Sequence, residues 1–112
     1  MIAFNRTKGR ALASRVEKAQ DPASRRRGLL GRERLAPQEG LWIAPCAMIH
    51  TFFMRFAIDA VFLDRRLKVV RVMEGLKPWR LSPWVWGAGS VLELAAGASR
   101  GLAAAGDQLE IN

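Results

Sequence analysis

Cys46 and His50 are the residues of this chain whose types could form a catalytic pair, and they are its only cysteine and only histidine. A thiol beside an imidazole can become a thiolate nucleophile when a carboxylate orients the base, and Asp59 or Glu93 could supply that carboxylate. A single cysteine that follows a proline is also typical of a small buried apolar residue. The pattern therefore leaves a small Cys/His hydrolase or transferase as an alternative function, with Cys46 and His50 as its catalytic candidates.

The same two residues argue against a metal centre. One thiolate and one imidazole leave a transition-metal site needing two carboxylates from elsewhere in the chain. A single cysteine also excludes an internal disulfide, which fits a reducing compartment. We therefore predict no cofactor and no metal, and we expect Cys46 to be an unreactive, largely buried thiol.

Asp59 and Glu93 each lie inside an otherwise apolar stretch with strand character. An unpaired charge there is costly to desolvate, so each carboxylate needs a partner or a polar cavity. A buried ion pair, for example of Asp59 with Arg55 or Arg71, and a polar cleft both remain open. Arg55 could also present its guanidinium group to a ligand carboxylate or phosphate. The predicted ligand-binding residues are His50, Thr51, Met54, Arg55, Asp59 and Glu93.

Trp79, Trp84 and Trp86 lie in a loop that two prolines keep from regular pairing. Exposed aromatic side chains on a loop can stack on a sugar, a peptide proline or a base. The interpretation that we favour is a lid that closes the core. Trp42, inside a short apolar run, is predicted to be a core residue.

Short apolar runs between turn signals predict the elements that must position these residues. Strand signals occur at 41–44, 49–53, 58–63, 67–73, 91–94 and 108–111. The two central runs, 58–63 and 67–73, form a hairpin about residues 64–66. The pattern predicts a mainly β fold, a small sandwich or barrel of about six or more short strands, with an α+β arrangement as the alternative.

Helical signals are few. Residues 10–19 fit either a strand or a helix by periodicity. Asp21 is a natural N-cap and Pro22 suits the first helical position, which predicts a short helix ending near Leu30 or Gly31. Residues 97–105 contain two glycines and form at most one or two helical turns. One or two short helices are therefore expected.

The length of 112 residues, half of them apolar, predicts one domain over 1–112. Residues 1–36 hold ten Lys or Arg against three acidic residues, which gives +7 of the net charge of +8. Nucleic acid, anionic lipid or an acidic protein could meet this basic region, although no aromatic residues interleave the arginines for base stacking. We find no stretch long enough for a signal peptide or a membrane span, and we expect a cytoplasmic protein.

Four blocks carry a resemblance to a known family. They are 27–32 (RGLLGR), Pro45-Cys46 with 49–64 (IHTFFMRFAIDAVFLD), 91–97 (VLELAAG) and Gly106-Asp107. In this order they resemble the bacterial-type domain-of-unknown-function family 192 (DUF192, UPF0127) from about residue 10 to the end, which leaves 1–9 as a short N-terminal extension. The resemblance implies a β-rich fold and a strand over 10–19, and it implies no activity. Many members carry a proline where this chain has Ala57.

The leading functional hypothesis is a non-catalytic binding module for a small molecule or peptide, acting as a monomer or weak dimer. Its cleft is expected where the six predicted ligand-binding residues meet beneath the tryptophan loop. The alternatives are the Cys/His enzyme and a binder of nucleic acid or an acidic partner that uses the basic N-terminal third.

Overall fold

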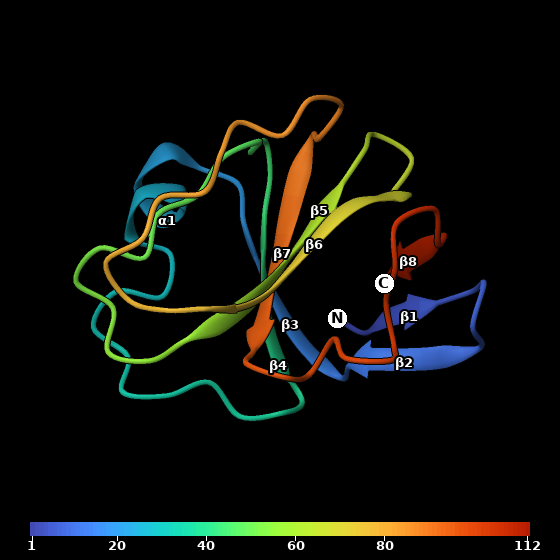
Figure 1. The fold of residues 1–112 in the computed structure, drawn as a ribbon, viewed down its shortest axis with the longest axis horizontal. Helices are drawn as coiled ribbons and strands as arrows, with labels where there is room; N and C mark the ends of the chain where they lie inside the picture. The colour runs from blue at the N-terminus through green and yellow to red at the C-terminus, as the bar shows by residue number, and fades with distance from the viewer.

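A computed structural model describes all residues, 1–112, and contains eight strands and one short helix (Figure 1). The strands are β1 (Ala3–Asn5), β2 (Arg10–Ala13), β3 (Arg15–Ala19), β4 (Glu39–Ile43), β5 (Ile58–Leu63), β6 (Val69–Leu76), β7 (Ser90–Ala95) and β8 (Leu109–Ile111). The helix is α1 (Pro22–Arg27). The predicted mainly β fold is confirmed.

The strands form two sheets. The larger sheet has the order β3-β4-β7-β5-β6, and the smaller has the order β2-β1-β8. Only β3 and β4 pair in parallel; every other pair is antiparallel. Since β3 and β6 are the edge strands of the larger sheet, each paired on one side only, the sheets do not close into a barrel.

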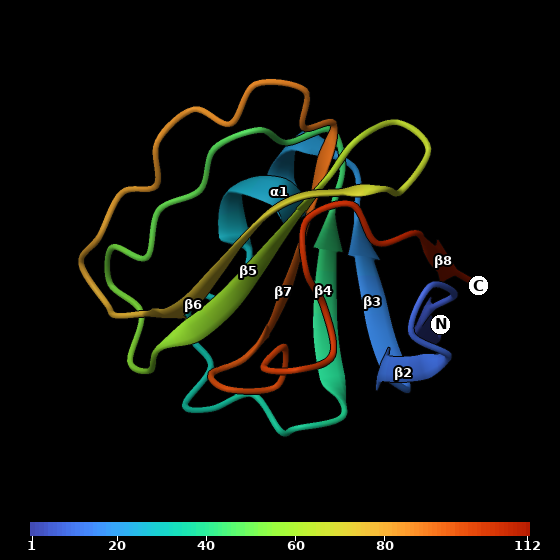
Figure 2. The ribbon, with the colours of Figure 1, turned by 45° about the vertical axis from the view of Figure 1, so that its right-hand side comes forward.

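The central strands β5 and β7 are buried on both faces, which explains why their sequences are apolar at consecutive positions. One face, including Ala60, Phe62 and Val91, belongs to a core cluster beneath α1 and the neighbouring loops. The other face, including Val61 and Leu92, packs in a second cluster with the smaller sheet. In Figures 1 and 2 the smaller sheet lies at one side of the molecule and the loops 44–57 and 77–89 lie at the opposite side.

Residues 10–19 form the two strands β2 and β3, as the family resemblance implied, with a break at Ser14 that takes the chain from one sheet to the other. Residues 1–9, expected as an N-terminal extension, contain β1, the central strand of the smaller sheet. The segment is therefore part of the fold.

The predicted strand over 49–53 is wrong. This segment makes a single antiparallel bridge, between His50 and Leu81, and no ladder. The partner loop carries Pro78 and Pro83, which have no N–H to donate, so regular pairing cannot extend along it.

Two other local predictions need correction. The helix α1 ends at Arg27, a turn earlier than expected, because Gly28 has a positive φ of 49° and accommodates the reversal. Residues 97–105 contain no helix, within the predicted limit of one or two helical turns, and both of their glycines have a positive φ. Trp42 is half-buried, its ring covered by the Lys18 ammonium group 4.5 Å from the ring centroid. No helix has the length and apolar character that a membrane crossing requires.

Candidate functional site

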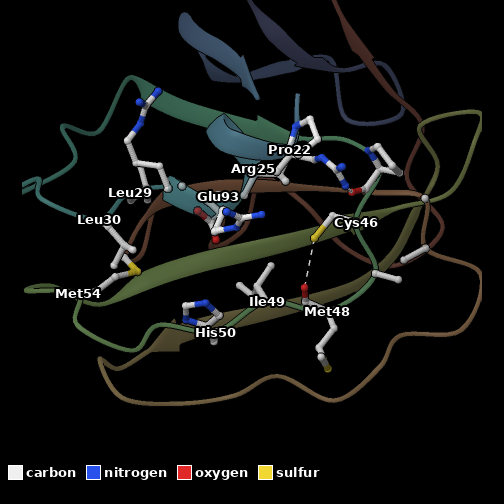
Figure 3. Close-up of a pocket in the computed structure, with 18 of the residues that line it drawn as sticks. Pro22, Arg25, Leu29, Leu30, Cys46, Met48, Ile49, His50, Met54 and Glu93 are labelled. Atoms are coloured by element: carbon white, nitrogen blue, oxygen red, sulfur yellow. Dashed lines mark hydrogen bonds between the residues drawn. The ribbon is translucent and has the colours of Figure 1, made fainter. Parts of the chain in front are cut away.

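A cavity of about 640 Å³ lies between α1, the loop that follows it and the loop 44–57, over one face of the larger sheet (Figure 3). Ten of its 19 lining residues are hydrophobic, so an apolar ligand surface would be well accommodated. The predicted site residues Cys46, His50, Met54 and Glu93 line this cavity. Thr51, Arg55 and Asp59 do not.

Glu93 is the buried carboxyl group of the cavity. Its strand β7 pairs with Leu41 on one side and Ala60 on the other, in the middle of the larger sheet. The residue is only 3% exposed, and no side chain or backbone group forms a hydrogen bond or ion pair with its carboxyl group. Burial raises the pKa of Glu93 to about 7. The group therefore changes charge near neutral pH without a protein partner.

Figure 3 places Glu93 centrally among the lining side chains, with Leu29 and Leu30 on one side and Cys46 on the other. These groups come from different parts of the chain. Glu93 comes from a central strand, and the apolar pair comes from the turn after α1. Burial among the lining side chains withdraws the Glu93 carboxyl group from water, and this raises its pKa.

The helix α1 brings positive charge to the same cavity. The exposed Asp21 caps the N-terminus of this helix, because its side chain accepts a hydrogen bond from the Ser24 N–H at 2.9 Å. The last turn then presents Arg25, Arg26 and Arg27, all of which line the cavity. The Arg25 Nη1 donates to the Pro45 carbonyl at 3.2 Å, whereas its Nε is buried without an acceptor.

The arginines of α1 were not among the predicted ligand-binding residues. In the sequence they belong to a broad basic region, and no periodicity relates them to Glu93. The signal that could have found them is the glycine and leucine block 27–32, which is part of the family pattern and folds against the same cavity.

Cys46 and His50 share the cavity but do not form a catalytic pair in this structure. The Cys46 thiol donates to the Met48 carbonyl at 3.2 Å, drawn as a dashed line in Figure 3. The His50 Nδ1 accepts from the Phe52 N–H at 3.3 Å, and the two rings stack. Burial raises the pKa of the Cys46 thiol, and the Glu93 charge adds to this rise. No three His, Cys, Asp or Glu side chains lie together as a metal site would require.

We expect Cys46 to react slowly with iodoacetamide in the folded protein near neutral pH. Burial keeps its thiol protonated, so alkylation should run at least about tenfold slower than in the denatured chain. Mass spectrometry over time measures both rates. Equal rates in the folded and denatured protein would contradict the expectation, and faster alkylation of the folded protein would support an activated nucleophile.

Asp59 is fully buried on the opposite face of the sheet from the cavity. Its Oδ1 accepts from the N–H groups of Gly75 and Gly97 at 2.9 and 3.1 Å. Its Oδ2 accepts from the N–H and the hydroxyl of Ser99 at 3.0 and 2.5 Å. Burial alone raises the pKa of Asp59, but these four hydrogen bonds outweigh burial and lower it. Asp59 therefore connects β5 to β6 and to the turn after β7.

Arg55 and Thr51 also lie outside the cavity. The Arg55 guanidinium is 3.8 Å from the Glu33 carboxylate in an exposed ion pair, a kind of contact that stabilises a fold little. The ion pair that we considered between Arg55 and Asp59 is not formed. Thr51 is buried, and its hydroxyl donates to the Lys77 carbonyl at 2.6 Å. Thr51 therefore holds the loops 44–57 and 77–89 together.

Comparisons with known proteins agree with this architecture. A UPF0127 protein of Thermococcus sibiricus is 34% identical, over 84% of this chain and 63% of that protein. The chain thus spans less than two thirds of the length of this curated relative. Among solved structures, a protein of unknown function from Novosphingobium aromaticivorans DSM 12444 is similar, with a TM-score of 0.85 and 24% identity over 98% of this chain and 83% of that one. This likeness concerns the fold alone.

A second solved structure, from Sinorhizobium meliloti 1021 and described provisionally as a transcription regulator, is similar with a TM-score of 0.78. It is 26% identical over 97% of this chain and 89% of that chain. The model of the DUF192 family, described as an uncharacterized ACR, matches residues 3–111. The resemblance found in the sequence is therefore confirmed, and this chain belongs to the DUF192 family.

Proposed function

We propose that this protein is a non-catalytic binding module whose cavity beneath α1 takes a small molecule with an apolar body and an anionic or hydrogen-bonding head group. The observation that carries the proposal is Glu93, a buried carboxyl group without a protein partner at a largely apolar cavity of about 640 Å³. A carboxyl group with a raised pKa at a cavity is a typical functional-site candidate. The cavity volume lies in the usual range for small-molecule sites.

The charges around the cavity define the head group. Arg25 has a buried Nε–H that lacks an acceptor, and Arg26 and Arg27 extend the positive surface. An anionic group of the ligand would be attracted to the guanidinium groups of these three residues. Glu93 with its pKa near 7 can donate one hydrogen bond when protonated and accept hydrogen bonds when ionised. Both features favour a polar head bound near Glu93 and Arg25.

The geometry supports the Cys/His enzyme less well. A nucleophilic cysteine needs a base in contact and a lowered thiol pKa. The Cys46 thiol instead donates to a backbone carbonyl, and its pKa is raised. The binding module is therefore the function that we propose.

Anilinonaphthalene sulfonate, an anionic aromatic probe, tests the proposal, and Cys46 reports where the probe binds. We expect the probe to bind with increased fluorescence and to slow the alkylation of Cys46 further, because that thiol lines the cavity. Ala47→Trp fills the cavity from its lining and should weaken binding at least about tenfold, since the ligand must displace a large side chain. Fluorescence titration and mass spectrometry measure the two effects.

Ala105→Trp is the matched control, because Ala105 is exposed and outside the cavity. This variant should bind the probe as the parent does. Saturating probe that leaves the Cys46 alkylation rate unchanged would refute binding in the cavity. So would equal probe affinities of the Ala47→Trp variant and the parent.

A further inference from the structure

The loops 44–57 and 77–89 gather apolar side chains on the outside of the molecule. Seven of the eleven large hydrophobic residues that the fold leaves exposed belong to these loops. Figures 1 and 2 both show the two loops side by side, away from the smaller sheet. Apart from Met48, we call these exposed loop residues the aromatic surface: Phe52, Phe53, Trp79, Leu81, Trp84 and Trp86. Phe52 and Phe53 lie against the Trp79 ring, and Trp84 also lines the cavity. Exposed apolar side chains that gather in one region often belong to an interaction site, whereas singly scattered ones are normal on any protein surface.

Hydrogen bonds make the two loops one unit. The Thr51 N–H donates to the Arg80 carbonyl at 2.8 Å, and the Trp79 N–H donates to the Thr51 carbonyl at 2.9 Å. The buried Thr51 hydroxyl oxygen also accepts from the Arg80 N–H at 2.9 Å. The aromatic surface is thus preorganised, which lowers the entropy lost when it meets a partner.

Phe53 and Trp79 have backbone conformations that favour glycine. Both have a φ of 65°, which non-glycine residues rarely adopt. Their rings contact each other with centroids 4.5 Å apart, yet the residues are 70% and 54% exposed. The strained backbone therefore presents two aromatic side chains to solvent instead of burying them in the core.

The charged residues within the two loops are all basic, and one of them, Arg55, is 3.8 Å from the Glu33 carboxylate outside the loops. The loops 44–57 and 77–89 contain no Asp or Glu, and they carry Arg55, Lys77 and Arg80. All three are exposed, and the whole chain has a net charge of +8. A partner that matches this surface presents apolar groups and negative charge together.

We propose that the aromatic surface docks the protein on an anionic lipid bilayer. Trp and Phe side chains enter the interface between headgroups and acyl chains, and nearby Lys and Arg side chains meet the lipid phosphates. A single-stranded nucleic acid fits less well, because it stacks its bases on open aromatic faces. Here the rings of Phe53 and Trp79 meet at an angle of 58° and so present no parallel faces for successive bases, and Leu81 offers no ring.

Co-sedimentation with vesicles tests the proposal. The protein should bind vesicles of equal parts phosphatidylcholine and phosphatidylglycerol, and binding should weaken with added salt and with phosphatidylcholine alone. The double variant Phe53→Asn/Trp86→Ser removes two exposed rings outside the cavity, and Asn tolerates the positive φ at position 53. We expect its vesicle partitioning to fall at least about tenfold. Ile2→Ser, at an exposed apolar residue outside the loops, should bind as the parent does.

A second pair of variants separates local charge from net charge. Lys77→Gln/Arg80→Gln should weaken partitioning by roughly tenfold or more, since each basic group near an anionic surface contributes about 1 kcal/mol. Arg10→Gln/Arg100→Gln removes the same charge from exposed positions elsewhere and should have a smaller effect.

Three results would overturn the membrane proposal. One is equal binding to neutral and anionic vesicles, and another is equal loss from the two charge variants. The third is that the protein does not bind vesicles at all. This includes the case in which the protein self-associates or binds single-stranded DNA instead and Phe53→Asn/Trp86→Ser abolishes that interaction. The cavity proposal is independent of these results, because Phe53 and Trp86 do not line the cavity.

Discussion

Asp59→Asn is expected to lower the free energy of unfolding by at least about 3 kcal/mol, because both carboxylate oxygens of Asp59 accept hydrogen bonds in a buried place. An asparagine keeps one oxygen and turns an NH₂ group toward N–H donors. Either Ser99 or the pair Gly75 and Gly97 then loses its acceptor. Urea denaturation followed by tryptophan fluorescence measures the change.

Asp64→Asn is the matched control for this substitution. The Asp64 Oδ1 alone accepts from the N–H groups of Arg66 and Lys68, at 2.8 and 2.9 Å in the turn of the hairpin. An asparagine oxygen can keep both contacts, so the loss should stay below about 1 kcal/mol. Equal, small losses in the two variants would show that Asp59 does not hold these elements together.

The hairpin of β5 and β6 was predictable because its signals are local. Residues 58–63 carry apolar side chains on both faces of the strand. Residues 64–66 form the turn, in which the Asp64 side chain accepts a hydrogen bond from the Arg66 N–H. Family resemblance added the strand over 10–19, which periodicity could not decide. Residues 49–53 carry a strand signal of their own, but the prolines of the partner loop prevent the pairing that a strand would need.

Asp59 and Glu93 looked equivalent in the sequence, since each interrupts an apolar strand. Sheet register separates them. Asp59 pairs with Leu94, and Glu93 pairs with Ala60, so the two carboxyl groups point to opposite faces. A register displaced by one residue would have placed both on the same face. No sequence signal fixes this register across the long connection between β5 and β7.

An irregularity in strand pairing provides one of the hydrogen-bond donors of the buried Asp59 carboxylate. The pairing of β5 with β6 is irregular between Ile58 and Ala60, where Gly75 has a φ of 61° and its N–H points to the Asp59 side chain. The Asp59 carboxylate thus accepts a hydrogen bond from the Gly75 N–H, which regular pairing of the two strands would have directed to a backbone carbonyl. Arginine partners, which we had considered, are not required.

Glu93 has the larger consequence for function, and its effect on stability depends on pH. The folded protein raises the pKa of this carboxyl group from 4.5 to about 7. Below pH 4.5 the group is protonated in both the folded and unfolded chains, so it does not alter the balance between them. As pH rises toward and through 7, the unfolded chain ionises first, and stability is lost. The loss approaches about 3 kcal/mol, at about 1.36 kcal/mol for each unit of the difference 7 − 4.5.

Glu93→Gln should remove this pH dependence, because glutamine resembles the protonated acid and cannot ionise. The variant and the parent should have similar unfolding free energies near pH 4.5, and the variant should be more stable by about 3 kcal/mol above pH 8. Comparing the two proteins at each pH cancels the titration of their other groups. Glu74→Gln, which removes an exposed carboxylate without a side-chain hydrogen bond, should show no comparable divergence from the parent. A difference that stays constant from pH 4.5 to pH 8 would disprove the raised pKa.

Above pH 7, Glu93→Gln should raise both the stability of the fold and its affinity for the anionic probe, because it removes one buried negative charge. A protein that gains stability from Glu93→Gln keeps the glutamate at a cost, which is the usual condition of residues that serve a site. The parent should bind the anionic probe more weakly as Glu93 ionises near pH 7, because like charges meet in a cavity of low polarity. The glutamine variant should lose that pH dependence while it gains stability. A stabilised variant that retains the pH-dependent affinity of the parent would remove Glu93 from the site.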